Sequence, residues 1–157
     1  MNRAFQVEGV GRRNPAPGVH LRFGQPNWVL LTVATANRSP WLANAEAQRW
    51  LHETWKEATA WLVTDYLLMP DHLHCFCAPR DLTISIEAWI TYWKRVFRRR
   101  HGRADWRFQS RGWHHRLRNA ESYAQKWLYV QANPVRRGLV TRSEEWPFQG
   151  RVHELRF

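Results

Sequence analysis

Two histidines separated by one residue are the first sign of chemistry in this sequence. His72 and His74 lie in the stretch MPDHLHCF, residues 69–76. In a β-strand alternate side chains point to the same face, so this spacing presents two imidazoles that can bind one metal ion. Cys75 and Cys77 then face the opposite side, which argues against a Cys2His2 zinc site and favours a packing role for both thiols. A surface histidine pair without function is the alternative interpretation.

A tyrosine and an asparagine four residues apart can complete such a site. Tyr129 and Asn133 lie in the helical stretch ESYAQKWLYVQANP, and their spacing places them on one helix face. The amide oxygen of asparagine suits a hard cation such as Mg²⁺ or Mn²⁺, and a phenol can act as a nucleophile. The four side chains would then form an open metal site beside a nucleophile. The alternative is a packed aromatic ring and a residue at a helix C-terminus.

The surrounding pattern predicts the elements that position these residues. Asn44 can cap a helix, and the turn Pro70-Asp71 joins two β-forming stretches into a hairpin. The order β-α-β-β-α-β plus an extra helix predicts an α+β fold, a ferredoxin-like antiparallel sheet with helices on one face and an extra C-terminal helix that carries Tyr129, the candidate nucleophile. The predicted strands are 27–36, 61–69, 72–78 and 112–118, and the predicted helices are 45–60, 81–102 and 119–134.

The charge balance indicates a partner that carries phosphates. The 157 residues include 24 Lys and Arg against 13 Asp and Glu, a formal net charge of +11. Most of the basic residues are arginines, which suit bidentate phosphate contacts. A basic enzyme that acts on a small anion is the alternative. Some of the 11 tryptophans can stack on unpaired bases, although most are expected in the core.

The length of the chain fits one domain, predicted at 27–157, after a basic N-terminal arm at 1–26. No apolar run is long enough to span a membrane, and the N-terminal stretch lacks the pattern of a signal peptide. Two cysteines are too few for a disulfide framework, which fits a reducing compartment. These features predict a cytoplasmic protein with no membrane partner.

Two motifs resemble the signatures of a known family. The stretch YLLMPDHLHCF, residues 66–76, and the stretch YVQANPVRRGLV, residues 129–140, are similar to the two signatures of the IS200-like tyrosine transposases, specifically the REP-associated subgroup. The order and separation of the two stretches also match. The resemblance covers about residues 27–149.

The resemblance implies an HUH endonuclease with defined roles for four residues. His72 and His74 would be the metal-binding pair, Asn133 would complete the site for Mg²⁺ or Mn²⁺, and Tyr129 would be the nucleophile. The implied substrate is single-stranded DNA with hairpins formed by REP-like palindromes. Cleavage would give a 5′-phosphotyrosine link and a free 3′-OH, which can rejoin strands. Asp71 is interpreted as turn structure, and the protein is expected to be a monomer or a homodimer.

Basic residues in three regions are candidates for DNA contacts. They lie in the N-terminal arm, at the end of the second predicted helix, and just before the helix that carries the tyrosine. A solvated basic face is the alternative for the helix end. The candidates are Arg12, Arg13, Lys94, Arg95, Arg98, Arg99, Arg100, Arg111, His114, His115, Arg116 and Arg118.

Three other tyrosines and three other functions are alternatives to these assignments. Tyr123 lies six residues before Tyr129, on roughly the opposite helix face, and Tyr66 and Tyr92 are expected to pack in the core. Three rival functions are a non-cutting hairpin-binding protein of the same fold, a replication or mobilisation initiator of the HUH class, and an RNA-binding ferredoxin-like module.

Overall fold

A five-stranded antiparallel sheet forms the centre of the computed structural model, which describes residues 27–155. The strand order is β4-β1-β3-β2-β5, so the first four strands have the ferredoxin-like arrangement. The strands are β1 (Val29–Ala34), β2 (Trp61–Leu68), β3 (His72–Pro79), β4 (Trp113–Arg116) and β5 (Gln149–Arg151). The helices are α1 (Ala45–Glu57), α2 (Ile86–His101), α3 (Ala120–Gln131) and α4 (Asn133–Arg136), with short 3-10 turns at Ala36–Arg38 and Ser143–Glu145.

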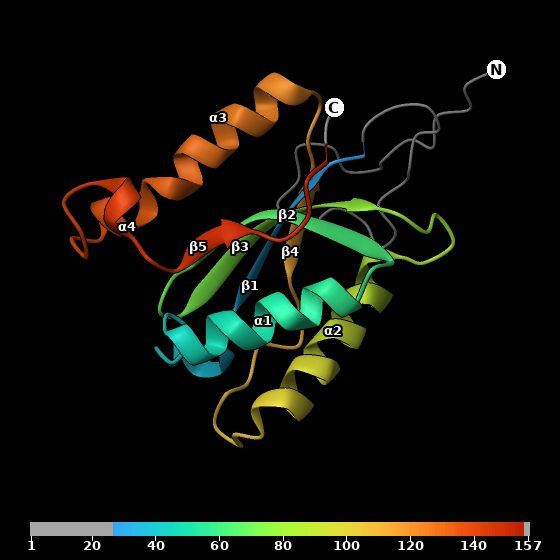
Figure 1. Ribbon diagram of the computed structural model, residues 1–157, viewed down its shortest axis with the longest axis horizontal. Helices are drawn as coiled ribbons and strands as arrows, with labels where there is room; N and C mark the ends of the chain where they lie inside the picture. Colours follow the sequence, from blue (N-terminus) through green and yellow to red (C-terminus); the bar gives the residue numbers. More distant parts are fainter. Residues whose placement is uncertain (1–26, 156–157) are drawn as a thin grey trace.

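The two faces of the sheet are covered by different helices, as Figure 1 shows. Helices α1 and α2 pack on one face through a core rich in tryptophan that includes Trp55, Trp89 and Trp93. Helix α3 covers the opposite face, where its Tyr123 ring packs on Phe76 of β3. The predicted fold class is therefore confirmed, and the extra C-terminal helix lies on the face that α1 and α2 leave open.

Several boundaries differ from the predicted ones for local reasons. Helix α2 begins at Ile86 rather than at residue 81, because the Asp81 carboxylate accepts from the backbone N–H and hydroxyl of Thr83, and Ser85 then caps the helix. The predicted helix 119–134 is divided at Ala132 into α3 and α4. Strand β5 is an additional edge strand that no sequence pattern indicated.

Backbone hydrogen bonds fix the turn between β2 and β3. Met69 N–H donates to the His72 carbonyl, and Thr35 N–H donates to the Asp71 carbonyl at 2.9 Å. Leu42 N–H donates to the carbonyl of Pro70. The start of β3, where His72 lies, is thus held from two sides.

Among the described residues, no helix is both long and apolar enough to cross a bilayer.

Candidate active site

The two histidines share one face of β3, as strand alternation predicts. His72 pairs across the sheet with Ala34, and His74 pairs with Thr32. The two imidazole rings stand nearly perpendicular, with their centroids 5.0 Å apart. Cys75 and Cys77 are free thiols buried on the opposite face, in the core under α1 and α2. The prediction that the cysteines are core residues is therefore confirmed.

Each imidazole is held through its Nδ1 atom. His72 Nδ1 donates to Asp71 Oδ1 at 2.8 Å, and His74 Nδ1 lies 2.8 Å from the hydroxyl of Thr32. No described residue forms a hydrogen bond with either Nε2 atom. A metal-binding histidine characteristically bonds a carboxylate or another polar group through one ring nitrogen and leaves the other for the metal. The pair therefore has the hydrogen-bonding pattern of two metal ligands.

Burial lowers the pKa of both histidines below the ordinary value of 6.5. It lowers the pKa of His72 although the neighbouring Asp71 carboxylate acts in the opposite direction. It lowers the pKa of His74 to about 3, and the charges of His72 and Arg136 add to the effect. A neutral imidazole has the free lone pair that a metal ion needs.

Asp71 has a larger role than the turn position assigned to it from the sequence. Its carboxylate accepts from His72, from Arg38 Nε at 3.0 Å and lies 3.6 Å from Arg137 Nη1. Burial acts to raise the pKa of Asp71, but the hydrogen bonds from His72 and Arg38 lower it below its ordinary value. The interpretation of Asp71 as turn structure alone was wrong. Asp71 precedes the first residue of β3, so the alternation of the strand does not determine where its side chain points.

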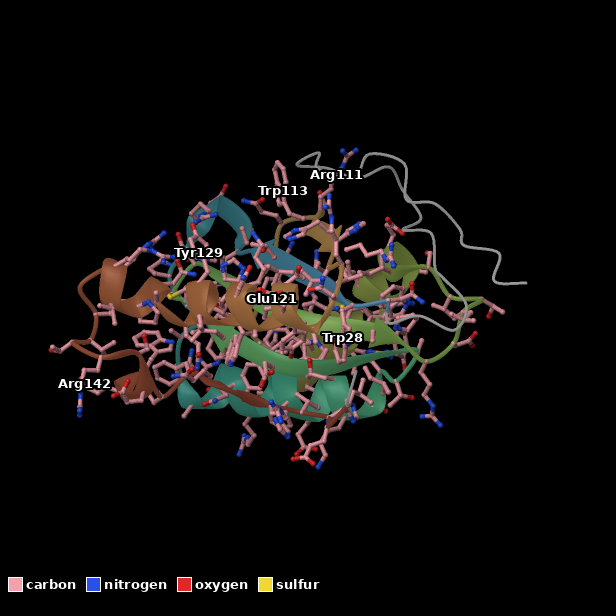
Figure 2. The ribbon with its side chains drawn as sticks, turned by 90° about the horizontal axis from the view of Figure 1, so that it is seen from above. Trp28, Arg111, Trp113, Glu121, Tyr129 and Arg142 are labelled. Atoms are coloured by element: carbon pink, nitrogen blue, oxygen red, sulfur yellow. The ribbon has the colours of Figure 1, made fainter. Side chains whose placement is uncertain are left out.

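Tyr129 is exposed on the last turn of α3, and Figure 2 shows it near the end that leads into α4. Its side chain is 64% exposed, so the hydroxyl is accessible to a large substrate. The guanidinium of Arg136 lies 4.4 Å from the centre of the Tyr129 ring, and its Nη1 donates to the Tyr129 carbonyl at 3.3 Å. The tyrosine is thus neither a packed core ring nor a free side chain, but is held by a cation–π contact.

Helix α4 connects the tyrosine to the histidine pair. Its Asn133 Oδ1 accepts from Arg136 Nη2 at 2.7 Å. The charge of Arg136 lowers the pKa of His74, and the charge of Arg137, the next residue along the chain, lowers that of His72. The end of the tyrosine helix therefore lies beside the start of β3. Sequence spacing did not identify Arg136 and Arg137, although both lie in the second motif.

The other tyrosines lie in different surroundings from Tyr129. The Tyr123 hydroxyl donates to Asp65 Oδ2 at 2.6 Å, and burial together with this bond raises its pKa. Tyr66 is buried as predicted. Tyr92 is 42% exposed, so the prediction that it packs in the core was wrong. Because Tyr92 belongs to α2, it lies on the side of the sheet away from the histidines.

The predicted DNA contacts on α2 differ in accessibility. Arg95, Arg98 and Arg99 are exposed, whereas Arg100 forms an ion pair with Glu57. Lys94 is half-buried, donates to the Gln109 carbonyl at 2.7 Å, and has its pKa lowered to about 8 by burial. A hollow of about 320 Å³ opens beside this helix, lined by Lys94, Arg95, Phe97, Arg98, Trp106, Arg107 and Phe108.

Among the predicted DNA contacts near β4, His114 is buried. His114 is only 7% exposed and its Nε2 bonds Glu87 of α2 at 3.1 Å, so it is a buried residue and not a DNA contact. Arg111 and Arg118 are exposed, and His115 and Arg116 are half-buried. Arg12 and Arg13 lie outside the described residues.

Solved structures of other proteins share this fold. No family model matches the chain. A solved structure of a REP-associated tyrosine transposase bound to a REP hairpin has a TM-score of 0.67 and 22% identity, covering 88% of this chain and 79% of that chain. A Deinococcus radiodurans R1 protein assigned as a transposase has a TM-score of 0.51 and 14% identity, covering 69% of this chain and 92% of its own.

A curated relative agrees with the structural neighbours. The REP-associated tyrosine transposase of Escherichia coli strain K12 is 29% identical over 125 residues, which are 74% of this chain and 72% of that protein. The chain thus resembles REP-associated tyrosine transposases in sequence and shares their fold, as the two motifs predicted.

Proposed function

We propose that this protein cuts and rejoins single-stranded DNA beside hairpins, with Tyr129 as the nucleophile. The observation that carries the proposal is the pair of imidazoles held through Nδ1, with Nε2 atoms that bond no described residue, beside a helix end that presents an exposed tyrosine. Resemblance to REP-associated tyrosine transposases supports the same assignment.

The donor set fits a divalent metal ion. His72 and His74 would hold it through Nε2, and Asn133 would add its amide oxygen after turning away from Arg136. In the described residues no cluster of three or more His, Cys, Asp or Glu side chains could hold a metal, and Asn133 would supply a ligand of another type. The amide oxygen suits Mg²⁺ or Mn²⁺, and the imidazole nitrogens suit transition metal ions. When bound, such an ion would polarise the scissile phosphate and offset its developing negative charge.

The protein's own residues would carry out the transfer. The Tyr129 oxygen would attack phosphorus and form a bond to the 5′ side of the break. The bond from phosphorus to the 3′ oxygen would break, and the phenolic proton would end on that oxygen to give a 3′-OH. Attack by a 3′-OH on the phosphotyrosine reverses the step and joins strands. Arg136 would hold the tyrosine ring during both steps through its cation–π contact.

The fold supports a site that is complete within one chain. Helix α3 packs on its own sheet, where Tyr123 bonds Asp65 of β2 and contacts Phe76 of β3. This packing supports a site in which the tyrosine and the histidine pair come from the same copy of the chain. The net charge of +11 favours a nucleic acid substrate.

Formation of a covalent protein–DNA adduct tests the proposal. A labelled hairpin oligonucleotide with single-stranded flanks is incubated with the protein and Mg²⁺ or Mn²⁺, then run on a denaturing gel. We expect a metal-dependent adduct that His74→Ala abolishes. Hairpin binding on a native gel without any adduct, whichever metal is supplied, would contradict the proposal and favour a non-cutting DNA-binding protein.

A further inference from the structure

Trp113 is a large aromatic side chain that the fold leaves at the surface. It is 45% exposed and begins β4, one of the two edge strands of the sheet. Figure 2 shows Trp113 and Arg111 at one rim of the molecule. Tryptophan is usually well buried, and Trp28, Trp61 and Trp89 in this protein are almost completely so. An exposed tryptophan on an edge strand is therefore a candidate for contact with a ligand.

The sheet register places Trp113 on the same face as the histidine pair. Thr32 of β1 pairs with Trp113 on one side and with His74 on the other. Directly paired residues in a sheet point to the same face, so these three side chains form one row across three strands. The Thr32 hydroxyl bonds His74 Nδ1 within that row. The backbones of Trp113 and His74 are therefore two strand spacings apart, which is about 10 Å.

The backbone next to Trp113 packs closely on β1, whereas the Trp113 ring has no partner among the described residues. A Cβ at Gly112 would lie 3.1 Å from Leu31 and 3.2 Å from Val33, so glycine allows a close approach of this segment to β1. Within residues 27–155 the Trp113 ring makes no aromatic contact and its indole N–H has no hydrogen bond. The exposed Arg111 lies two residues before it. An apolar plane beside a cation thus faces solvent in line with the candidate site.

We propose that Trp113 is a stacking platform for an unpaired base of the DNA strand that enters the site. The proposal rests on the function proposed above and names a subsite of it. An aromatic plane offers stacking to any base, and a nearby arginine can contact the adjoining phosphate. The separation of about 10 Å from His74 would place the stacked base close to the scissile phosphate. The strong positive charge of the chain favours a nucleic acid over a second protein as the occupant.

The test compares hairpins with and without single-stranded flanks. Fluorescence anisotropy at one fixed salt concentration gives the Kd of each hairpin for wild type, Trp113→Ala and Trp113→Phe. We expect Trp113→Ala to weaken binding of the flanked hairpin by about 5- to 100-fold, with little change for the unflanked hairpin. Trp113→Phe should restore much of the loss because a plane is kept. The matched control is Tyr92→Ala, which removes an aromatic ring of similar exposure from α2.

Each other outcome overturns the platform in a distinguishable way. If wild type binds neither hairpin, the proposed function fails and the platform fails with it. If wild type prefers the flanked hairpin and Trp113→Ala keeps that preference in full, the function stands and the platform is rejected. If Trp113→Ala alters only the oligomeric state measured by light scattering, the surface joins two copies of the chain instead. Circular dichroism of each variant confirms that the fold is retained.

Discussion

Each imidazole of the histidine pair is oriented through its Nδ1 atom, His72 by Asp71 and His74 by Thr32. The Asp71 carboxylate also accepts a hydrogen bond from Arg38 and lies near the guanidinium of Arg137. A carboxylate that holds a metal-binding histidine fixes its tautomer and raises its affinity for the metal. Asp71 therefore links the β3 histidines to the positively charged end of the tyrosine helix.

Replacing this carboxylate should weaken metal binding. We expect Asp71→Asn to lower the affinity for Mn²⁺ by about 10- to 100-fold, because the amide holds the His72 ring less strongly. Isothermal titration calorimetry measures the change directly. Asp81→Asn is the matched control, since among the described residues the Asp81 carboxylate bonds nearby Thr83 in an exposed turn. Equal Mn²⁺ affinity in Asp71→Asn and wild type would show that the carboxylate does not support the metal site.

Helix α3 is fixed to the sheet by a cluster of polar groups at an irregularity in β2. The register of β2 against β3 shifts between Val63 and Tyr66, and the two intervening residues, Thr64 and Asp65, both contact the hydroxyl of Tyr123. Arg151 of β5 donates to the same Asp65 carboxylate at 3.0 Å. A β-bulge of this kind redirects side chains, and here it binds α3 and β5 to one strand.

Loss of the Tyr123 hydroxyl should loosen this attachment without removing the nucleophile. We expect Tyr123→Phe to reduce the free energy of unfolding by about 1–3 kcal/mol, because buried Asp65 loses a donor. Urea denaturation measures the difference. Tyr92→Phe, at an exposed position on α2, should have almost no effect. Wild-type stability in Tyr123→Phe would mean that ring packing alone holds the helix.

At the level of elements, alternation and spacing predicted much of this arrangement. Alternation in β3 correctly separated the two histidines from Cys75 and Cys77. It could not describe Asp71, because a turn residue does not follow the period of the strand. The break at Ala132 and the short strand β5 depend on packing and pairing partners distant in sequence, which local propensity does not contain. The burial of His114 likewise depends on Glu87 of α2.

For the whole molecule, the excess of positive charge should make DNA binding sensitive to salt. Cations that neutralise phosphates release counterions, so the logarithm of affinity falls linearly with the logarithm of salt concentration. We expect Arg98→Gln, at the exposed hollow beside α2, to reduce this slope by about 1. Arg142→Gln should leave the slope unchanged, because Arg142 pairs with Glu144 and Glu145. Equal slopes for all three proteins would remove Arg98 from the interface.

Buried histidines should make the fold sensitive to acid. Burial lowers the pKa of His101 and of His114 below the ordinary value of 6.5, and Glu87 opposes the effect at His114 only in part. As the pH falls below that value, the unfolded chain binds protons that the folded chain does not, so stability decreases. Urea denaturation from about pH 7.5 to about pH 5.5 should show this loss. His114→Gln should flatten the dependence, and an unchanged slope would exclude His114 as a contributor.

In the proposed reaction Tyr129, rather than another tyrosine, becomes joined to DNA. The most direct measurement is mass spectrometry of tryptic peptides from the protein–DNA adduct after nuclease trimming. Trypsin places Tyr129 in the peptide 127–136 and Tyr123 in the peptide 119–126, so the two are separated. We predict a nucleotide mass on the first peptide, on the tyrosine itself, and its loss in Tyr129→Phe. A nucleotide on any other peptide, or an adduct that persists in Tyr129→Phe, would contradict this assignment of the nucleophile.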